Sequence, residues 1–303
     1  MLTVLVSVLL SSRVLLVAAE AVFYGGIPTV GVLYDDKIKE HYCTASVVES
    51  TSRNILITAS HCLSTDGTEM NFAPGYFNGT APYGTYPVEA LYVSPDWNKN
   101  FNIKRDFAFV RLGKGKYKGK KVHVQDVTGG NKLRIGAGYT QKVEIVGYAY
   151  GEQRPRHCSS ETYRAKDGQM GIECGPLQSG TSGSPWLANY NSGTRRGDVI
   201  GDIGGWHTGG CDDYETFSCR FSKATLELFN RAVAGGPGDT VTGGAPENCN
   251  SSSQSRKKLH AAVKAPMSAC DDLFERLHAF VGPSILFSEQ RRLLLSSVTH
   301  AAT

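Results

Sequence analysis

The segment Gly180-Thr181-Ser182-Gly183-Ser184-Pro185 places the hydroxyl of Ser182 between two glycines. Glycine adopts left-handed backbone angles and lets the backbone approach a ligand closely. A serine on such a turn can present its Oγ outward, beside its own N–H and that of Gly180. Acyl transfer requires this combination, a nucleophile with two donors for the developing oxyanion. Taken alone, the segment is equally typical of a Gly/Ser-rich surface turn.

Candidates for a base and an orienting acid both lie upstream. The apolar run that starts at Ile55 stops at a small-residue turn and ends in His61, next to Cys62. Asp106 opens a stretch of alternating large residues, a pattern typical of a half-buried strand. A single histidine or aspartate indicates little by itself. The three sites in the order histidine, aspartate, serine together predict a nucleophilic site.

Three blocks resemble the active-site blocks of the chymotrypsin/trypsin-like serine peptidases. They are T-A-S-H-C at 58–62, D-F-A-F-V-R-L at 106–112 and G-T-S-G-S-P at 180–185. The segment 43–48 is similar to the strand that these enzymes join by a disulfide to the histidine turn. Segments 72–76 and 81–84 narrow the resemblance to secreted trypsin-like peptidases of bacteria and filamentous fungi. It covers roughly residues 27 to 232.

The resemblance implies an all-β fold, with two antiparallel Greek-key β-barrels and the active site in the cleft between them. His61 and Asp106 then lie on the first barrel and Ser182 on the second. His61 is expected to be the base, Asp106 its orienting acid, and the N–H groups of Gly180 and Ser182 the oxyanion hole. The implied function is a secreted serine endopeptidase that needs no cofactor. The alternative is an inactive homologue that acts as a binding or decoy protein.

The substrate pocket is less well specified. By resemblance, the segment 203–210, with Gly205, Trp206 and His207, is a strand that lines the primary pocket. Enzymes of the family that select Arg or Lys carry an aspartate six residues before the nucleophile, where this chain has Pro176. Asp212 or Asp213 could supply charge from the other wall. His207 could instead favour an acidic side chain, as in glutamyl endopeptidases, or be an ordinary surface histidine.

Eight cysteines, an even number, predict a set of disulfides in an exported protein. The resemblance implies the pair Cys43–Cys62. Order and proximity suggest Cys158–Cys174 and Cys211–Cys219, which leaves Cys249–Cys270. Zinc is the competing interpretation, because His61 adjoins Cys62 and His157 adjoins Cys158, but the chain contains no C-x-x-C pair. We therefore expect no metal.

The N-terminus and the charge distribution bear on location and partners. Residues 1–19 are mostly apolar, with Arg13 as their only charged side chain, and end in Val17-Ala18-Ala19. This pattern favours a secretory signal over a membrane anchor. The net charge of +4 is diffuse, apart from a lysine-rich run at 114–121 that favours a solvated loop over an anion-binding patch. We expect a secreted monomer that acts on proteins or peptides, without a nucleic-acid partner or stable membrane anchor.

Short apolar segments separated by polar turns predict strands throughout the mature chain. The candidates in the first half are 27–34, 42–49, 54–58, 86–93, 107–112 and 122–127. Those in the second half are 141–149, 170–174, 184–188, 198–204 and 219–221. A helix over 221–233 with Leu226, Phe229 and Val233 on one face closes the domain, packed by resemblance on the second barrel.

The predicted organisation is a signal peptide (1–19), a first barrel (20–130), and a second barrel with its closing helix (131–234). A Gly/Pro/Ser-rich linker (235–258) and a partly disordered or helical tail of unknown role (259–303) follow. The sequons at Asn78 and Asn250 are candidate glycosylation sites in exposed loops.

Overall fold

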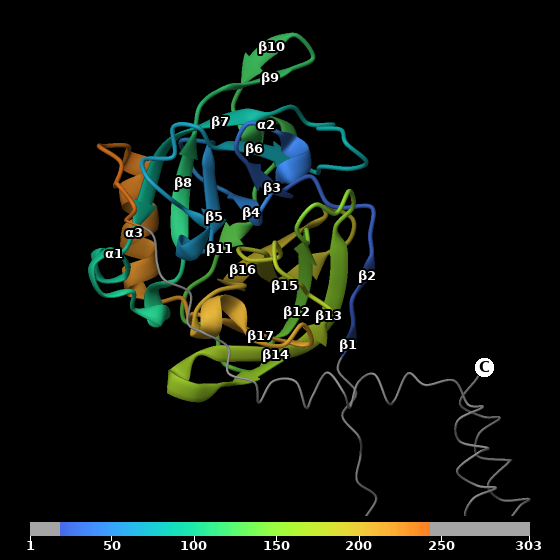
Figure 1. Ribbon diagram of the computed structural model, residues 1–303, viewed down its shortest axis with the longest axis vertical. Helices are drawn as coiled ribbons and strands as arrows, with labels where there is room; N and C mark the ends of the chain where they lie inside the picture. Colours follow the sequence, from blue (N-terminus) through green and yellow to red (C-terminus); the bar gives the residue numbers. More distant parts are fainter. Residues whose placement is uncertain (1–18, 243–303) are drawn as a thin grey trace, which may run out of the picture. The chain divides into compact units, whose positions relative to one another are not determined.

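The computed structural model describes residues 19–242 (Figure 1). Residues 1–18 of the predicted signal peptide and the predicted tail at 259–303 lie outside this range. Six strands form a closed barrel in the order β3-β4-β5-β8-β7-β6. Their bounds are β3 Val30–Tyr34, β4 Cys43–Val48, β5 Ile55–Thr58, β6 Asn71–Pro74, β7 Tyr86–Val93 and β8 Ala108–Leu112. Five of the six predicted strands of the first half are therefore present.

The second sheet is built mainly from the second half of the chain. Within the described residues its order is β1-β14-β13-β12-β15-β16-β11, with β17 paired to β14 and β2 paired to β13. The bounds are β11 Lys132–Leu133, β12 Lys142–Gly147, β13 Arg156–Arg164, β14 Met170–Gly175, β15 Pro185–Asn191, β16 Arg196–Asp202 and β17 Glu215–Ser218. Together with the closed barrel, this sheet confirms the trypsin-like double-barrel architecture with a C-terminal helix.

The N-terminal residues attach to the second sheet. Strand β1 (Ala19–Glu20) pairs in parallel with β14, and β2 (Val22–Phe23) pairs with β13. Residues 20–23 therefore do not belong to the first barrel, to which the sequence analysis assigned them. Strand β11 also pairs in parallel with β16, so the second sheet is not purely antiparallel.

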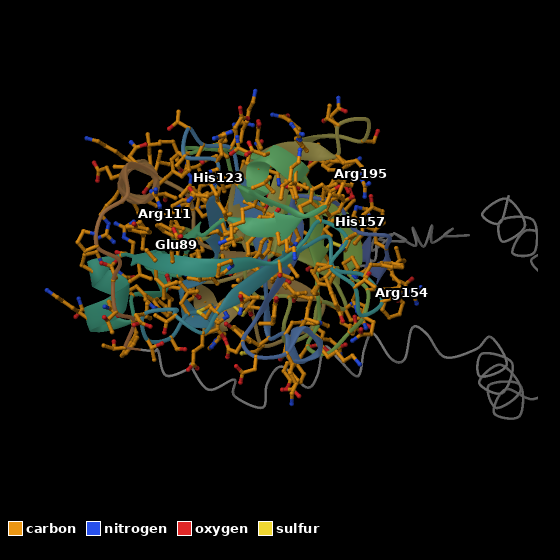
Figure 2. All side chains as sticks on the ribbon, turned by 90° about the horizontal axis from the view of Figure 1, so that it is seen from above. Glu89, Arg111, His123, Arg154, His157 and Arg195 are labelled. Atoms are coloured by element: carbon orange, nitrogen blue, oxygen red, sulfur yellow. A yellow bond between two sulfur atoms is a disulfide. The ribbon has the colours of Figure 1, made fainter. Side chains whose placement is uncertain are left out.

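The closing helix α3 (Lys223–Ala234) begins with a capping box between Ser222 and Thr225. It lies against β7 and β8, so the expectation that it packs on the second barrel was wrong (Figure 1). Its buried residues are Thr225, Leu228 and Ala232, whereas Leu226 is 37% exposed. Arg111 of β8, labelled in Figure 2, donates to the Ala232 and Val233 carbonyls at the end of this helix.

Three predicted elements differ in the structure. Residues 122–127 were predicted as a strand, but α2 (Val124–Thr128) is a helix that buries Val124 and Thr128. The last strand is β17, not the predicted 219–221. The lysine-rich run forms the hairpin β9 (Gly115–Tyr117) and β10 (Lys120–Val122), with its lysines exposed.

The predicted linker is ordered where the structure describes it. Val241 is 3% exposed and its backbone pairs with that of Thr65, while the Asp239 carboxylate accepts the Val93 N–H. Asp239 and Val241 thus attach this segment to the first barrel, and residues 243–258 lie outside the described range. A short helix, α1 (Pro95–Asn100), capped by Ser94, precedes the loop that leads to Asp106.

Candidate active site

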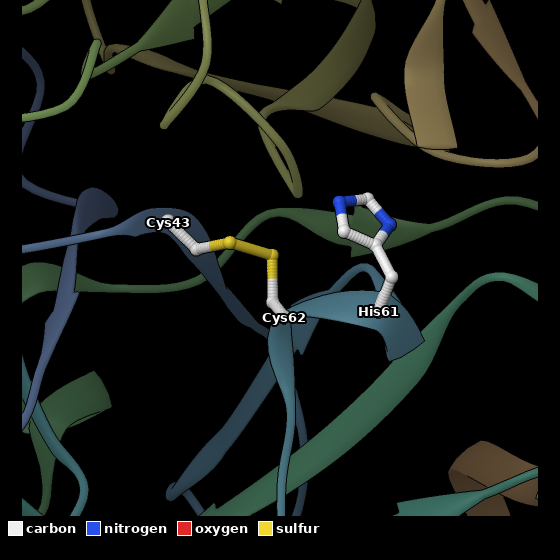
Figure 3. A group of neighbouring side chains, drawn as sticks. All are labelled: Cys43, His61 and Cys62. Carbon is white, nitrogen blue, oxygen red and sulfur yellow. A yellow bond between two sulfur atoms is a disulfide. The ribbon is translucent and has the colours of Figure 1, made fainter. Parts of the chain in front are cut away.

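His61 lies in a one-turn helix, Ser60–Cys62, directly after β5. The Cys43–Cys62 disulfide fixes this turn to β4, and the imidazole stands beside the bridge (Figure 3). The His61 side chain keeps 16% of its surface exposed. The base candidate is therefore held by rigid strands on one side and reachable from solvent on the other.

Asp106 is fully buried and holds the histidine through two hydrogen bonds. Its Oδ2 accepts from His61 Nδ1 at 2.8 Å and its Oδ1 accepts from the His61 backbone N–H at 2.9 Å. Oδ2 also accepts the Gly205 N–H at 2.8 Å. Because an ionised carboxylate only accepts, Nδ1 carries the proton, which leaves Nε2 of the neutral ring as the basic nitrogen.

Ser182 lies on a turn that precedes β15 in the second sheet. Gly180 has φ +97° and Gly183 φ +79°, and a Cβ on either would contact backbone, Tyr150 N at 2.2 Å and the Thr44 carbonyl oxygen at 2.3 Å. Both positions therefore require glycine. Among the described residues, no hydrogen bond joins Ser182 Oγ to His61 Nε2.

Thr44 connects this turn to the first barrel, a role that the sequence analysis missed. Its N–H donates to the Ser182 carbonyl at 2.9 Å, and its Oγ1 donates to the Gly180 carbonyl at 3.1 Å. Its own carbonyl accepts from Thr58 Oγ1 at 2.8 Å, just upstream of His61. The only sequence signal for this connection is a threonine next to Cys43 in a segment predicted as a strand.

The backbone donors of the turn fall into two groups. The N–H groups of Thr181, Gly183 and Ser184 donate to carbonyls within the fold. In the part of the chain that the structure describes, the N–H groups of Gly180 and Ser182 donate to nothing. The two donors predicted for an oxyanion are thus the two that the fold leaves free.

The matching family model is that of the trypsin-like peptidase domain, and it covers residues 43–197. This chain belongs to the trypsin-like peptidases. The fold is that of solved proteases, among them the protease Anisep from Arthrobacter nicotinovorans, with 23% identity and a TM-score of 0.60 over 72% of this chain and 100% of that one. The thermostable serine protease AL20 from an extremophilic microorganism matches with 21% identity and a TM-score of 0.57, over 68% and 97%.

Human heparin binding protein shares the fold at 12% identity and a TM-score of 0.55, over 73% of this chain and 99% of that one. A comparison with curated proteins gave no match. Membership of the trypsin-like peptidases supports serine peptidase activity and protein substrates in general terms.

The predicted pocket residues of this trypsin-like peptidase lie on two neighbouring segments. Strand β16 ends at Asp202, so 203–210 does not form the expected strand, and Trp206–Gly209 is a short helical turn. The Trp206 ring lies 4.4 Å from that of His207 and 4.9 Å from that of Phe217, measured between centroids. Pro176 directly follows β14, and the next N–H, of Leu177, donates to the Asp213 carbonyl.

The cysteines confirm two of the predicted pairs and correct a third. Disulfides join Cys43 to Cys62 and Cys158 to Cys174. Cys211 is also disulfide-bonded, but Cys219 is a free, buried thiol, so the predicted Cys211–Cys219 pair is wrong. Cys219 lies against the loop before Asp106, where its Sγ contacts the Ile103 carbonyl at 3.0 Å. Cys249 and Cys270 lie outside the described residues.

A single cluster of three potential metal ligands occurs in the described range, at Cys43, His61 and Cys62 (Figure 3). The disulfide consumes both sulfurs, so the cluster offers only the histidine nitrogen. His157 bonds Glu144 at 2.6 Å. The two histidines that suggested zinc therefore bond carboxylates, His61 to Asp106 and His157 to Glu144.

No helix within residues 19–242 combines the length and the apolar character that a bilayer span requires. Asn78 is exposed on a turn at φ +47°, whereas Asn250 lies outside the described residues.

Proposed function

We propose that this chain is a secreted serine endopeptidase whose catalytic residues are His61, Asp106 and Ser182. The observation that carries the proposal is the 2.8 Å bond from His61 Nδ1 to Asp106 Oδ2, next to a serine turn with two free N–H donors. An ionised carboxylate can only accept hydrogen bonds, so Asp106 selects the tautomer in which Nδ1 carries the proton and Nε2 can act as the general base. The Thr44 contacts hold the base and the nucleophile on one framework.

In the proposed reaction, His61 Nε2 removes the Ser182 proton as Oγ attacks the carbonyl carbon of the scissile peptide bond. The Gly180 and Ser182 N–H groups bind the oxyanion of the tetrahedral intermediate. His61 then donates its proton to the amine nitrogen, the C–N bond breaks, and an acyl-enzyme forms at Ser182. Water, deprotonated by His61, attacks the ester and releases the acid. Asp106 remains ionised throughout and stabilises the imidazolium.

The missing Ser182–His61 hydrogen bond is compatible with this mechanism. Such bonds are often long without substrate and shorten in the Michaelis complex. The Ser182 side chain is only partly buried, so a rotation about its Cα–Cβ bond can move Oγ while the buried backbone at Gly180 and Gly183 stays in place. We infer that substrate binding brings Oγ within reach of Nε2.

Secretion and glycosylation are part of the proposal. Two described disulfides and a further bonded cysteine, Cys211, favour an oxidising compartment. The exposed Asn78 turn leaves room for a glycan in a host that attaches one. Expression of the full chain in a eukaryotic secretion host, followed by glycosidase treatment and mass measurement, tests both.

The activity is tested by digesting a peptide library with the wild type and with the variants Ser182→Ala, His61→Ala and Asp106→Asn. Each change is expected to lower kcat/KM by about 10⁴-fold or more without unfolding the protein, because these groups act as one unit. The matched control is Ser192→Ala, a serine exposed in the loop after β15. A serine-directed fluorophosphonate should not label Ser182→Ala. In the other proteins, the rate of labelling should change in parallel with kcat/KM.

Turnover by Ser182→Ala equal to that of wild type would contradict the assignment of the nucleophile. A folded wild type that neither cleaves the library nor takes the label would support the alternative, a binding or decoy protein. The cleaved sequences also determine the pocket preference.

A further inference from the structure

Asp202 is a second fully buried carboxyl close to the active site, and the mechanism above does not use it. It is the last residue of β16 and its exposure is 0%. Among the described residues, neither of its carboxyl oxygens has a hydrogen-bond partner. The hydroxyl of Ser218 does not donate to the Asp202 carboxyl, because its Oγ accepts the Asp202 backbone N–H at 2.9 Å and donates to the Cys219 carbonyl.

The charged and titratable groups around Asp202 come from three segments. Asp106, at the start of the segment that leads into β8, is the charge that acts on Asp202. Cys219, after β17, is influenced by both carboxyls and, to a smaller extent, by Arg105. Its thiol is directed to the Ile103 carbonyl and leaves Asp202 without a donor. His61 reaches this group only through Asp106.

The two carboxyls have opposite environments. Asp106 accepts three hydrogen bonds, from His61 Nδ1, the His61 N–H and the Gly205 N–H, so its charge is stabilised. Asp202 has no such donors, and its ionisation would place a second negative charge in the same dry region. Burial, and secondly the nearby Asp106, raises the pKa of Asp202 well above its usual range. The neutral acid is the stable form of Asp202.

The position of Asp202 in the chain connects it to catalysis. The next residue, Ile203, accepts the Gly183 N–H at 2.8 Å, beside Ser182. Two residues further, the Gly205 N–H donates to Asp106 Oδ2. The segment 202–205 therefore bonds both the serine turn and the orienting acid, and a displacement of Asp202 would disturb both.

We propose that Asp202 is a positioning residue for the His61–Asp106–Ser182 site and performs this role as a protonated, neutral acid. The proposal rests on the proposed function. When Asp202 loses its proton to hydroxide, repulsion by Asp106 and the lack of donors drive the carboxylate toward water. The segment 202–205 then moves, and the bonds to Gly183 and Asp106 weaken. Loss of this proton sets an alkaline limit to activity.

The test compares kcat/KM of the full-length wild type and Asp202→Asn from about pH 5 to about pH 11. Asparagine has nearly the same shape and carries no charge at any pH. We expect equal kcat/KM, within about threefold, up to neutral pH. At alkaline pH the wild type should lose about tenfold or more through an ionisation that Asp202→Asn lacks. The matched control Asp198→Asn, on the same strand but bonded to Asn189, should retain the wild-type alkaline loss.

Superimposable pH profiles of wild type and Asp202→Asn would overturn the proposal. A decrease by one constant factor at every pH would also overturn it, because that result indicates a purely structural role. Should Asp202→Asn fail to fold, infrared spectroscopy of the wild type decides instead. A protonated carboxyl band must persist at pH 7, where ordinary Asp and Glu are ionised, and disappear together with activity. This readout needs no turnover at pH 7, so a missing band refutes the role of Asp202 even where the triad assignment holds.

Discussion

Replacement of Gly180 by alanine provides a demanding test of the oxyanion hole. Gly180 has φ +97°, where an L-residue costs about 1–2 kcal/mol. The added Cβ would lie 2.2 Å from Tyr150 N and 2.8 Å from Ala149 C, both backbone atoms. Tyr150 N also donates to the Ser179 carbonyl at 2.7 Å, so the two backbone segments cannot simply separate. Relief of the clash therefore strains this bond and rotates the Ser179–Gly180 peptide, which carries both the bonded carbonyl and the Gly180 N–H.

That rotation would turn one of the two proposed oxyanion donors away from the substrate. Removal of one such donor typically lowers kcat by about 10²–10³-fold, which corresponds to about 3–4 kcal/mol of transition-state stabilisation. We therefore expect Gly180→Ala to lower kcat by this factor, with a smaller change in KM because the donor acts mainly in the transition state. The assay is steady-state hydrolysis of the best peptide from the library, with thermal unfolding measured in parallel.

Gly119→Ala is the matched control. Gly119 also has a positive φ, +80°, but no atom beyond its chain neighbours lies within 4 Å of the position that a Cβ would occupy. It lies in the β9–β10 turn and should lose about 1 kcal/mol of stability with unchanged kcat. If folded Gly180→Ala retained kcat within about threefold of wild type, the oxyanion role of this N–H would be refuted.

Three further predictions concern pH, the disulfide and activation. Burial lowers the pKa of His41, so below about pH 6.5 the unfolded chain binds a proton that the folded protein does not bind. The free energy of unfolding, measured by urea titration, should therefore fall as the pH drops through this range. The variant His41→Gln should show a smaller fall. Replacing both Cys43 and Cys62 by alanine opens a loop with a sequence separation of 19 and should lower the free energy of unfolding by about 3 kcal/mol. It should also lower kcat. An unchanged kcat would show that the disulfide does not position His61. Thr181 is buried and uncharged, and its hydroxyl donates to the Gln178 carbonyl, so it offers no partner for an inserted N-terminal amine. A chain extended by a few residues before Glu20 should have the same turnover as the unextended chain. Activity that is restored only by trimming the extension would contradict this prediction.

Local patterns in the sequence predicted most of the strands. The apolar segments 86–93 and 107–112 predicted β7 and β8. Burial alternates along the first half of β7, whereas β8 is buried at four of its five positions. The segment 122–127 has similar apolar content but forms α2. Short apolar runs do not distinguish helix from strand, and burial of Val124 and Thr128 decides for the helix. Strand β13 was missed because its sequence, R-H-C-S-S-E-T-Y-R, is mostly polar, and pairing with β12 and β14 organises it.

Short motifs in the sequence identified which residues can carry the chemistry and in which order they occur. The types of His61, Asp106 and Ser182, and the glycines around the serine, follow from short motifs whose backbone needs are local. Tertiary structure decided which groups meet: Gly205 reaches Asp106 across 99 residues, and Thr44 reaches Gly180 across 136. It also decided that Cys219 stays a thiol and that Asp202 is buried without a partner. The physical reason is that hydrogen bonds and burial between distant segments depend on strand pairing and on the packing of the two barrels, which no local pattern encodes.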